Sequence, residues 1–106
     1  MNIKIIETDT YQKELRKLAK DIREQIEKKV SHLKDNPQLG KHLKYLDMWE
    51  LIIGSYRVFY QIQNNKIELL VIVLALDHKK HLDKKYQLIT PALIQKAKEY
   101  REKKNF

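Results

Sequence analysis

The stretch of residues 49–60 limits the folds open to this chain more than any other part of the sequence. It consists of two runs rich in β-branched and aromatic residues, which meet at Gly54-Ser55. A glycine at that point supplies the positive φ that tight hairpin turns require. The pattern therefore predicts a β-hairpin.

Arg57 is the unusual residue of this hairpin. Alternation along the second strand puts it on the face opposite to Val58 and Tyr60. One interpretation is an arginine at a sheet edge, with its charge in water or paired with Glu50. The other is an arginine that binds an anion from a rigid strand. The hairpin by itself favours the first interpretation.

The segments before the hairpin predict one strand and two helices. Residues 3–6 read as a short strand, and apolar residues then recur at steps of three or four over residues 11–33. Lys20-Asp21 is a natural break in this stripe, because aspartate caps a helix better than it fills one. Asn36-Pro37 ends the second helix, since a residue before proline is pushed out of the helical region. Residues 37–48 are expected to form a connecting loop.

The segments after the hairpin predict one more strand and one more helix. The strand expected over residues 66–76 is, after its opening lysine and but for Glu68, apolar on both faces, which is typical of a central strand covered from both sides. Thr90-Pro91 opens a terminal helix over residues 90–106. The sequence thus predicts a single α+β domain, residues 1–106, with the order β-α-α-β-β-β-α. A helical hairpin is expected on one face of a mainly antiparallel four-stranded sheet, with the last helix at the other face or edge.

Composition narrows the classes of function. The chain of 106 residues contains no cysteine, which excludes disulfides and thiolate chemistry and fits a reducing cytoplasm. No apolar run reaches the ~20 residues of a membrane span, and the N-terminus lacks the apolar core of a signal peptide. The protein is expected in the cytoplasm, with no membrane partner.

The charge is unevenly distributed. The formal net charge is +8, and residues 77–106 hold nine basic and four acidic side chains, which gives +5 for under a third of the chain. A basic segment of this kind favours nucleic acid or an acidic protein as a partner.

Together these features resemble the RelE/ParE superfamily of toxins from type II toxin–antitoxin systems, over about residues 1–86. The most specific part is a tryptophan, a hydrophobic run and a Gly-x-Tyr-Arg-Val-x-Tyr pattern, matched by Trp49, Gly54, Tyr56, Arg57, Val58 and Tyr60. Asn36-Pro37, Gly40 and Leu43-Lys44 support it. The family usually follows its central strand with a basic segment that starts at a histidine and ends in tyrosine, here His78-Lys79-Lys80 with Tyr86.

The resemblance implies a toxin held inactive by a separately encoded antitoxin. Members of the RelE branch are endoribonucleases that cut mRNA on the ribosome without a metal or other cofactor, and this activity is the expected one. Members of the ParE branch instead bind DNA gyrase and cut no RNA. Glu50 and Ile52 stand where the family often has basic residues, which favours this alternative or an inactive homologue that only binds antitoxin.

The resemblance also implies roles for individual residues. Arg57 would clamp the scissile phosphate, and Lys79 or Lys80 would supply a second cation. Tyr86 would act as acid, base or stacking residue, and His78 and His81 could share the proton transfer. Further basic residues are expected to bind RNA: Lys41, His42, Lys44, Lys84 and Lys85.

Overall fold

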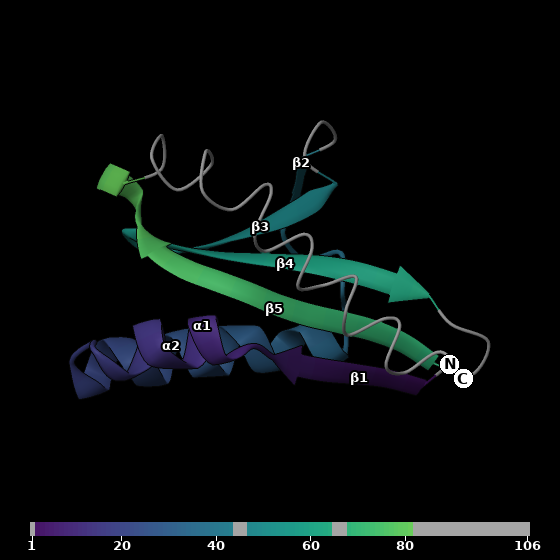
Figure 1. Ribbon diagram of the computed structural model, residues 1–106, viewed down its shortest axis with the longest axis horizontal. Helices are drawn as coiled ribbons and strands as arrows, with labels where there is room; N and C mark the ends of the chain where they lie inside the picture. Colours follow the sequence, from purple (N-terminus) through teal and green to yellow (C-terminus); the bar gives the residue numbers. More distant parts are fainter. Residues whose placement is uncertain (1, 44–46, 65–67, 82–106) are drawn as a thin grey trace.

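The computed structural model describes residues 2–43, 47–64 and 68–81 (Figure 1). The helical elements are α1 (Asp9–Arg16), α2 (Lys20–Ser31) and the short 3-10 turns η1 (His32–Lys34) and η3 (Lys79–His81). The strands are β1 (Asn2–Glu7), β2 (Lys41–Leu43), β3 (Met48–Ile53), β4 (Tyr56–Asn64) and β5 (Glu68–His78). The expected helix over residues 90–106 lies outside the described residues. In the part of the chain that is described, no helix is long and apolar enough to cross a membrane.

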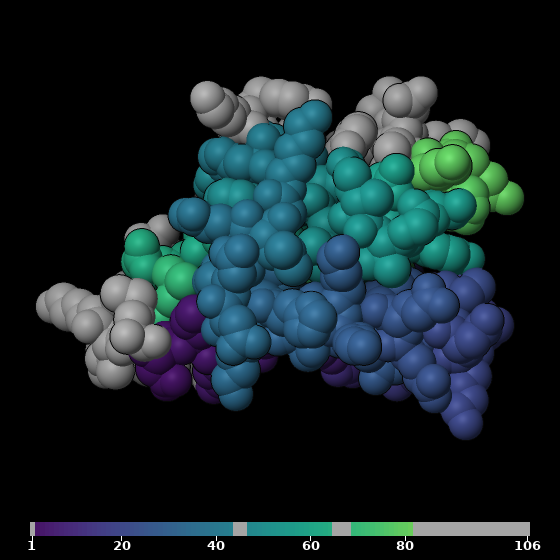
Figure 2. All heavy atoms as spheres, turned by 180° about the vertical axis from the view of Figure 1, so that it is seen from behind, coloured from purple at the N-terminus to yellow at the C-terminus, as the bar shows by residue number. Residues whose placement is uncertain are grey.

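The helical hairpin forms as the sequence predicts, but its break lies at residues 17–19 and not at Lys20-Asp21, which form the first turn of α2. Thr8 caps α1, because its hydroxyl oxygen accepts a hydrogen bond from the Tyr11 N–H at 3.2 Å. Figure 1 shows α1 and α2 lying together on one side of the strands. Seen from behind, in Figure 2, α2 runs across the lower part of the molecule and the light green end of β5 lies at one edge.

The sheet has five strands rather than the expected four, in the order β1-β5-β4-β3-β2. β1 pairs with β5 in parallel, and all other neighbours are antiparallel. The added strand is β2, within residues 37–48, which the sequence predicted to be a loop. Three residues are too few to show a strand period, so their pairing with β3 is decided by tertiary contact. Gly40 permits this contact, because a Cβ there would lie 2.6 Å from the Glu50 carbonyl oxygen.

The hairpin itself is confirmed. Ile53 pairs with Tyr56 across the two-residue turn, and Gly54 has a φ of +57°. This left-handed conformation favours glycine, as the sequence indicated.

The sheet is buried on both faces, as predicted for the apolar run of β5. The helix-side cluster joins residues of α1, α2 and the strands, among them Tyr11, Leu15, Ile26, Val58, Tyr60, Val71 and Val73. The cluster on the opposite face contains Leu43, Met48, Phe59, Leu70, Ile72, Leu74 and Ala75. Every residue of β5 from Leu70 to Leu76 is at most 1 % exposed.

β5 contains a bulge that reverses its two faces near its carboxyl end. Phe59 of β4 lies opposite Ala75, and Tyr60 lies opposite Val73, so Leu74 has no partner on β4. Leu74 and Ala75 consequently pack in the same cluster, on the face away from the helices. Strict alternation would have put position 78 on that face as well. The bulge instead turns it toward the helices.

Beyond the end of β1, α1 and its cap form hydrogen bonds with the outer edge of the bulged segment of β5. β1 ends at Glu7, opposite Val73. Beyond it, the Thr8 hydroxyl donates to the Leu74 carbonyl oxygen at 2.8 Å, and the Leu76 N–H donates to the Glu14 carboxylate at 3.0 Å. Polar side chains of α1 and its cap therefore satisfy backbone groups that a longer β1 would have paired.

Candidate functional site at the end of β5

A hydrogen bond joins the basic turn after β5 to the hairpin turn. The Lys79 N–H donates to the Ser55 carbonyl oxygen at 2.7 Å. Because of this bond, η3 lies against the end of the sheet that carries Arg57. Lys79, Lys80 and His81 are all exposed there.

Arg57 is half-buried, and the backbone of its own hairpin fixes its position. Its Nη1 donates to the carbonyl oxygens of Gly54 and Tyr56, both at 2.9 Å. Among the described residues it forms no ion pair, so the predicted pairing with Glu50 does not occur. A guanidinium has five N–H donors, and those on Nε and Nη2 remain for an anion.

The two histidines are held by different contacts. His78 Nδ1 accepts the Lys80 N–H at 3.1 Å, so the proton of its neutral ring lies on Nε2. His81 Nδ1 lies 2.9 Å from the Asp77 carboxylate, which favours a proton on that nitrogen. The Asp77 carboxylate also accepts the His78 N–H at 2.8 Å. The other ring nitrogen of His81, Nε2, can then take part in proton transfer.

The bulge separates the predicted catalytic residues between two faces. The His78 ring meets the Tyr56 ring edge to face, with centroids 5.2 Å apart, on the helix side. Arg57 alternates with Tyr56 and thus lies on the opposite face with Phe59. The structure therefore brings Arg57, Lys79, Lys80 and His81 to one end of the sheet. His78 is turned to the helix side, away from Arg57, and Lys80 and His81 line a cavity on that side with it.

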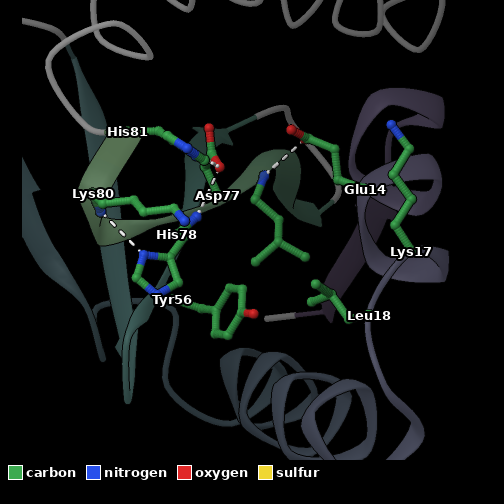
Figure 3. Close-up of a pocket in the computed structure, with 9 residues that line it drawn as sticks. Glu14, Lys17, Leu18, Tyr56, Asp77, His78, Lys80 and His81 are labelled. Carbon is green, nitrogen blue, oxygen red and sulfur yellow. Dashed lines mark hydrogen bonds and ion pairs between the residues drawn. The ribbon is translucent and has the colours of Figure 1, made fainter.

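An open cavity of about 340 Å³ lies on the helix side of this end. Figure 3 shows Glu14, Lys17 and Leu18 across from Tyr56 and His78. Its remaining lining residues are Leu76, Asp77, Lys80 and His81. Sequence reasoning missed Glu14 and Lys17 as site residues. The one signal was an acid on the apolar stripe of the helix, three residues after Tyr11 and four before Leu18.

The predicted RNA-binding residues of β2 also lie on opposite faces. His42 stacks on Trp49 with ring centroids 4.8 Å apart, and Trp49 in turn stacks on Tyr60 at 6.1 Å, on the helix side. Lys41 lies opposite Glu50 in the register of β2 and β3, so it is on the same face of the sheet as Arg57. Lys44, Lys84, Lys85 and Tyr86 lie outside the described residues.

Two further residues lie on the face of the sheet that carries Arg57. Ile52 lies directly opposite Arg57 in the hairpin and is 48 % exposed, while Glu50 is 8 % exposed. Among the described residues, no group of three or more His, Asp or Glu is placed to hold a metal ion.

Comparison with solved structures shows the same fold in known toxins. The chain is 26 % identical to a mutant of the Escherichia coli toxin RelE in the free state, with two arginines replaced by alanine; the match covers 82 % of this chain and 93 % of that one at a TM-score of 0.65. The toxin–antitoxin complex RelBE2 from Mycobacterium tuberculosis matches at 24 % identity, 74 % and 99 % coverage and a TM-score of 0.63. The intact E. coli RelBE complex matches at 26 % identity, 74 % and 96 % coverage and a TM-score of 0.57.

Sequence comparison gives the family. No curated protein matches the chain. The family described as ParE toxin of type II toxin-antitoxin system, parDE, matches residues 5–83, which include the end of β1, the helical hairpin, β2 to β5 and η3. The chain therefore belongs to the RelE/ParE superfamily of toxins of type II toxin–antitoxin systems.

Proposed function

We propose that the protein is an endoribonuclease that cuts mRNA on the ribosome, in the cytoplasm, without a metal ion. One observation carries the proposal. The bond from the Lys79 N–H to the Ser55 carbonyl oxygen holds a turn with two lysines and a histidine beside the strand of Arg57. Cations brought to one end of the sheet in this way suit a phosphate, because they can stabilise the charge that develops in phosphoryl transfer.

The reaction requires three events at the scissile phosphate. The 2′-hydroxyl loses its proton, the phosphorane's negative charge is stabilised, and the 5′-oxygen gains a proton as it leaves. Arg57 would stabilise the charge through the N–H groups that the hairpin backbone leaves open, with Lys79 or Lys80 as the second cation. His81, oriented by Asp77, would move one proton, and Tyr86 would assist as acid, base or stacking residue.

A second candidate is a toxin that binds a protein target, as ParE-branch members bind gyrase. The residues on the face of the sheet that carries Arg57 favour this candidate. Ile52 exposes apolar surface directly opposite Arg57, and the acidic residue Glu50 lies on the same face of the hairpin. An inactive homologue that binds only antitoxin would share these features.

We also propose that the protein binds a separately encoded antitoxin. Two of the similar structures are toxin–antitoxin complexes, one of them the intact E. coli RelBE pair. The net charge of +8 favours an acidic partner. Co-expression with the product of the neighbouring gene and copurification of a stable complex would test this, and an antitoxin that leaves growth arrest unchanged would count against it.

The order of events in cells separates the two toxin candidates. If the protein cuts mRNA, expression without antitoxin should stop protein synthesis before DNA synthesis, as measured by pulse labelling. If DNA synthesis stops first, the gyrase-type candidate replaces the ribonuclease.

The role of Arg57 is tested on purified protein. Arg57→Ala should lower ribosome-dependent mRNA cleavage by about 10²–10³-fold, as loss of a charge-stabilising donor does. Arg57→Lys should recover only part of this, because an ammonium lacks the planar fork. Arg23→Ala, which removes an arginine from α2 in the helical layer, is the matched control and should cut normally. A folded Arg57→Ala protein with the wild-type rate would remove Arg57 from the site.

A further inference from the structure

We infer that the cavity on the helix side of the β5 end binds one nucleotide of an RNA strand. This inference rests on the proposed function for the source of the nucleotide. It concerns the face of the sheet opposite to Arg57, where the bulge has turned His78.

The floor of the cavity suits a nucleobase. Leu18 and Leu76 give it apolar surface, and Tyr56 adds an aromatic ring. The His78 ring meets Tyr56 edge to face at an interplanar angle of 77°, so the two rings form a corner rather than a closed stack. Any of the four bases can stack on such a ring, because each has a π-face. The volume of about 340 Å³ lies within the range of small-molecule sites.

The rim of the cavity holds two lysines and two carboxylates. Both carboxylates of the cavity are engaged by protein donors, Glu14 by the Leu76 N–H and Asp77 by the His78 N–H. The ammonium groups of Lys17 and Lys80, in contrast, form no hydrogen bond or ion pair with the described part of the chain. A phosphate attached to the base would bring an anion to these two lysines.

The position of the cavity favours an RNA strand over a separate mononucleotide. Tyr56 of the cavity precedes Arg57, Lys80 follows Lys79, and the bond from Lys79 to Ser55 joins the two segments. A strand with one phosphate at Arg57 can therefore pass round the sheet end and place a neighbouring nucleotide in the cavity. A second cavity of about 340 Å³, which includes Lys29 and Leu39, has no aromatic ring.

Amide chemical shifts of the full chain, measured by NMR during titration, test the inference without ribosomes. The probes are AMP, adenosine, inorganic phosphate and the RNA trinucleotide of adenylate. AMP should shift the amides of Leu18 and residues 76–81 and bind more tightly than adenosine or phosphate alone. The trinucleotide should bind more tightly still and also shift Arg57. AMP that binds as tightly as the trinucleotide would overturn the RNA strand as the source.

Two variants locate the ligand. Lys17→Glu should weaken AMP binding by about tenfold, the size expected for loss of one charge-assisted hydrogen bond. Lys28→Glu makes the same charge change on the exposed surface of α2 and should leave AMP binding unchanged. Tyr56→Leu keeps an apolar floor but removes the ring, and should weaken adenosine binding by about fivefold or more. Equal AMP affinity in the two lysine variants, or no shifts at the cavity, would overturn the inference.

The same titrations separate this inference from the proposed function. Shifts at the cavity in a protein that fails to cut mRNA on ribosomes would overturn the ribonuclease proposal and the RNA source together, while the nucleotide site itself would remain. Ribosome-dependent cleavage by a protein whose cavity shows no shifts would overturn the cavity and leave the ribonuclease.

Discussion

At the scale of single residues, two buried tyrosines differ in how their hydroxyl groups are satisfied. The Tyr60 hydroxyl donates to the Pro37 carbonyl oxygen at 2.7 Å and accepts the Gly40 N–H at 3.0 Å. It thereby ties the turn before β2 to the sheet. The Tyr11 hydroxyl is buried and has no hydrogen-bond partner among the described residues. A buried hydroxyl without a partner lowers the free energy of unfolding.

Replacing each tyrosine by phenylalanine should thus have opposite effects on the free energy of unfolding. Tyr11→Phe removes an unsatisfied hydroxyl and should raise it by about 1 kcal/mol. Tyr60→Phe leaves the Gly40 N–H and the Pro37 carbonyl without their partner and should lower it by about 1–3 kcal/mol. Urea denaturation with equal m-values would measure both. Equal losses in the two variants would mean that the Tyr11 hydroxyl has a partner after all.

At the scale of elements, β5 is an inner strand of the sheet, between β1 and β4. The side chains that it places on the face away from the helices offer a test of the core. Ile72 is fully buried there beside Leu70 and Leu74, as alternation predicted. Ile72→Ala should lower the free energy of unfolding by about 2–5 kcal/mol. Ile52→Ala makes the same change at a position that is 48 % exposed and should cost less than about 0.5 kcal/mol. Similar costs at both positions in denaturant melts would contradict the burial of this face.

The contact between the elements α1 and β5 can also be tested. Glu14→Ala removes the acceptor of the Leu76 N–H and should lower the free energy of unfolding by about 1–3 kcal/mol. Glu14→Gln keeps a carbonyl acceptor and should cost less. Hydrogen exchange at the Leu76 amide should speed up in the alanine variant, because the bulged segment loses one of its edge contacts.

The control is Glu24→Ala, which removes an exposed glutamate that pairs with Lys20 on α2 at 4.0 Å. Its cost should stay within about 0.5 kcal/mol. If Leu76 exchanges at the same rate in the Glu14 and Glu24 variants, α1 does not hold the end of β5.

At the scale of the whole molecule, the buried tyrosines link stability to alkaline pH. Burial raises the pKa of Tyr11 above its ordinary value, with Glu7 and Glu27 adding to the rise. Burial also raises the pKa of Tyr60, and the Gly40 N–H opposes it. Above about pH 10 the unfolded chain loses these protons first. The native state then binds more protons, so the free energy of unfolding falls as pH rises.

Urea melts between pH 7 and 11 should show this fall only above about pH 10, since the tyrosine contribution is fully present below the unfolded pKa. The double variant Tyr11→Phe, Tyr60→Phe should show a shallower fall than the wild type. Because lysines titrate in the same range and are common to both proteins, an identical slope in the double variant would assign the effect to them instead.

The sequence alone determined the features that depend on neighbouring residues. The turn at Gly54-Ser55 requires a positive φ, and the helical hairpin follows from a stripe with a period near 3.6. The apolar run before Asp77 predicted a strand buried on both faces. Arg57 was singled out because a charge in an apolar hairpin is locally conspicuous. These signals span a few residues each, so reading them requires no knowledge of the fold.

The tertiary structure decided where those elements meet. β2 exists because Gly40 lets residues 41–43 approach β3, a contact that no local period records. The bulge at Leu74 depends on pairing with β4, and it turned His78 away from Arg57. Glu14 entered the cavity because β1 stops short of the end of β5, which leaves the Leu76 N–H for α1 to satisfy. Strand register and backbone satisfaction depend on residues distant in sequence, which is why a site divided between two faces emerged only from the folded chain.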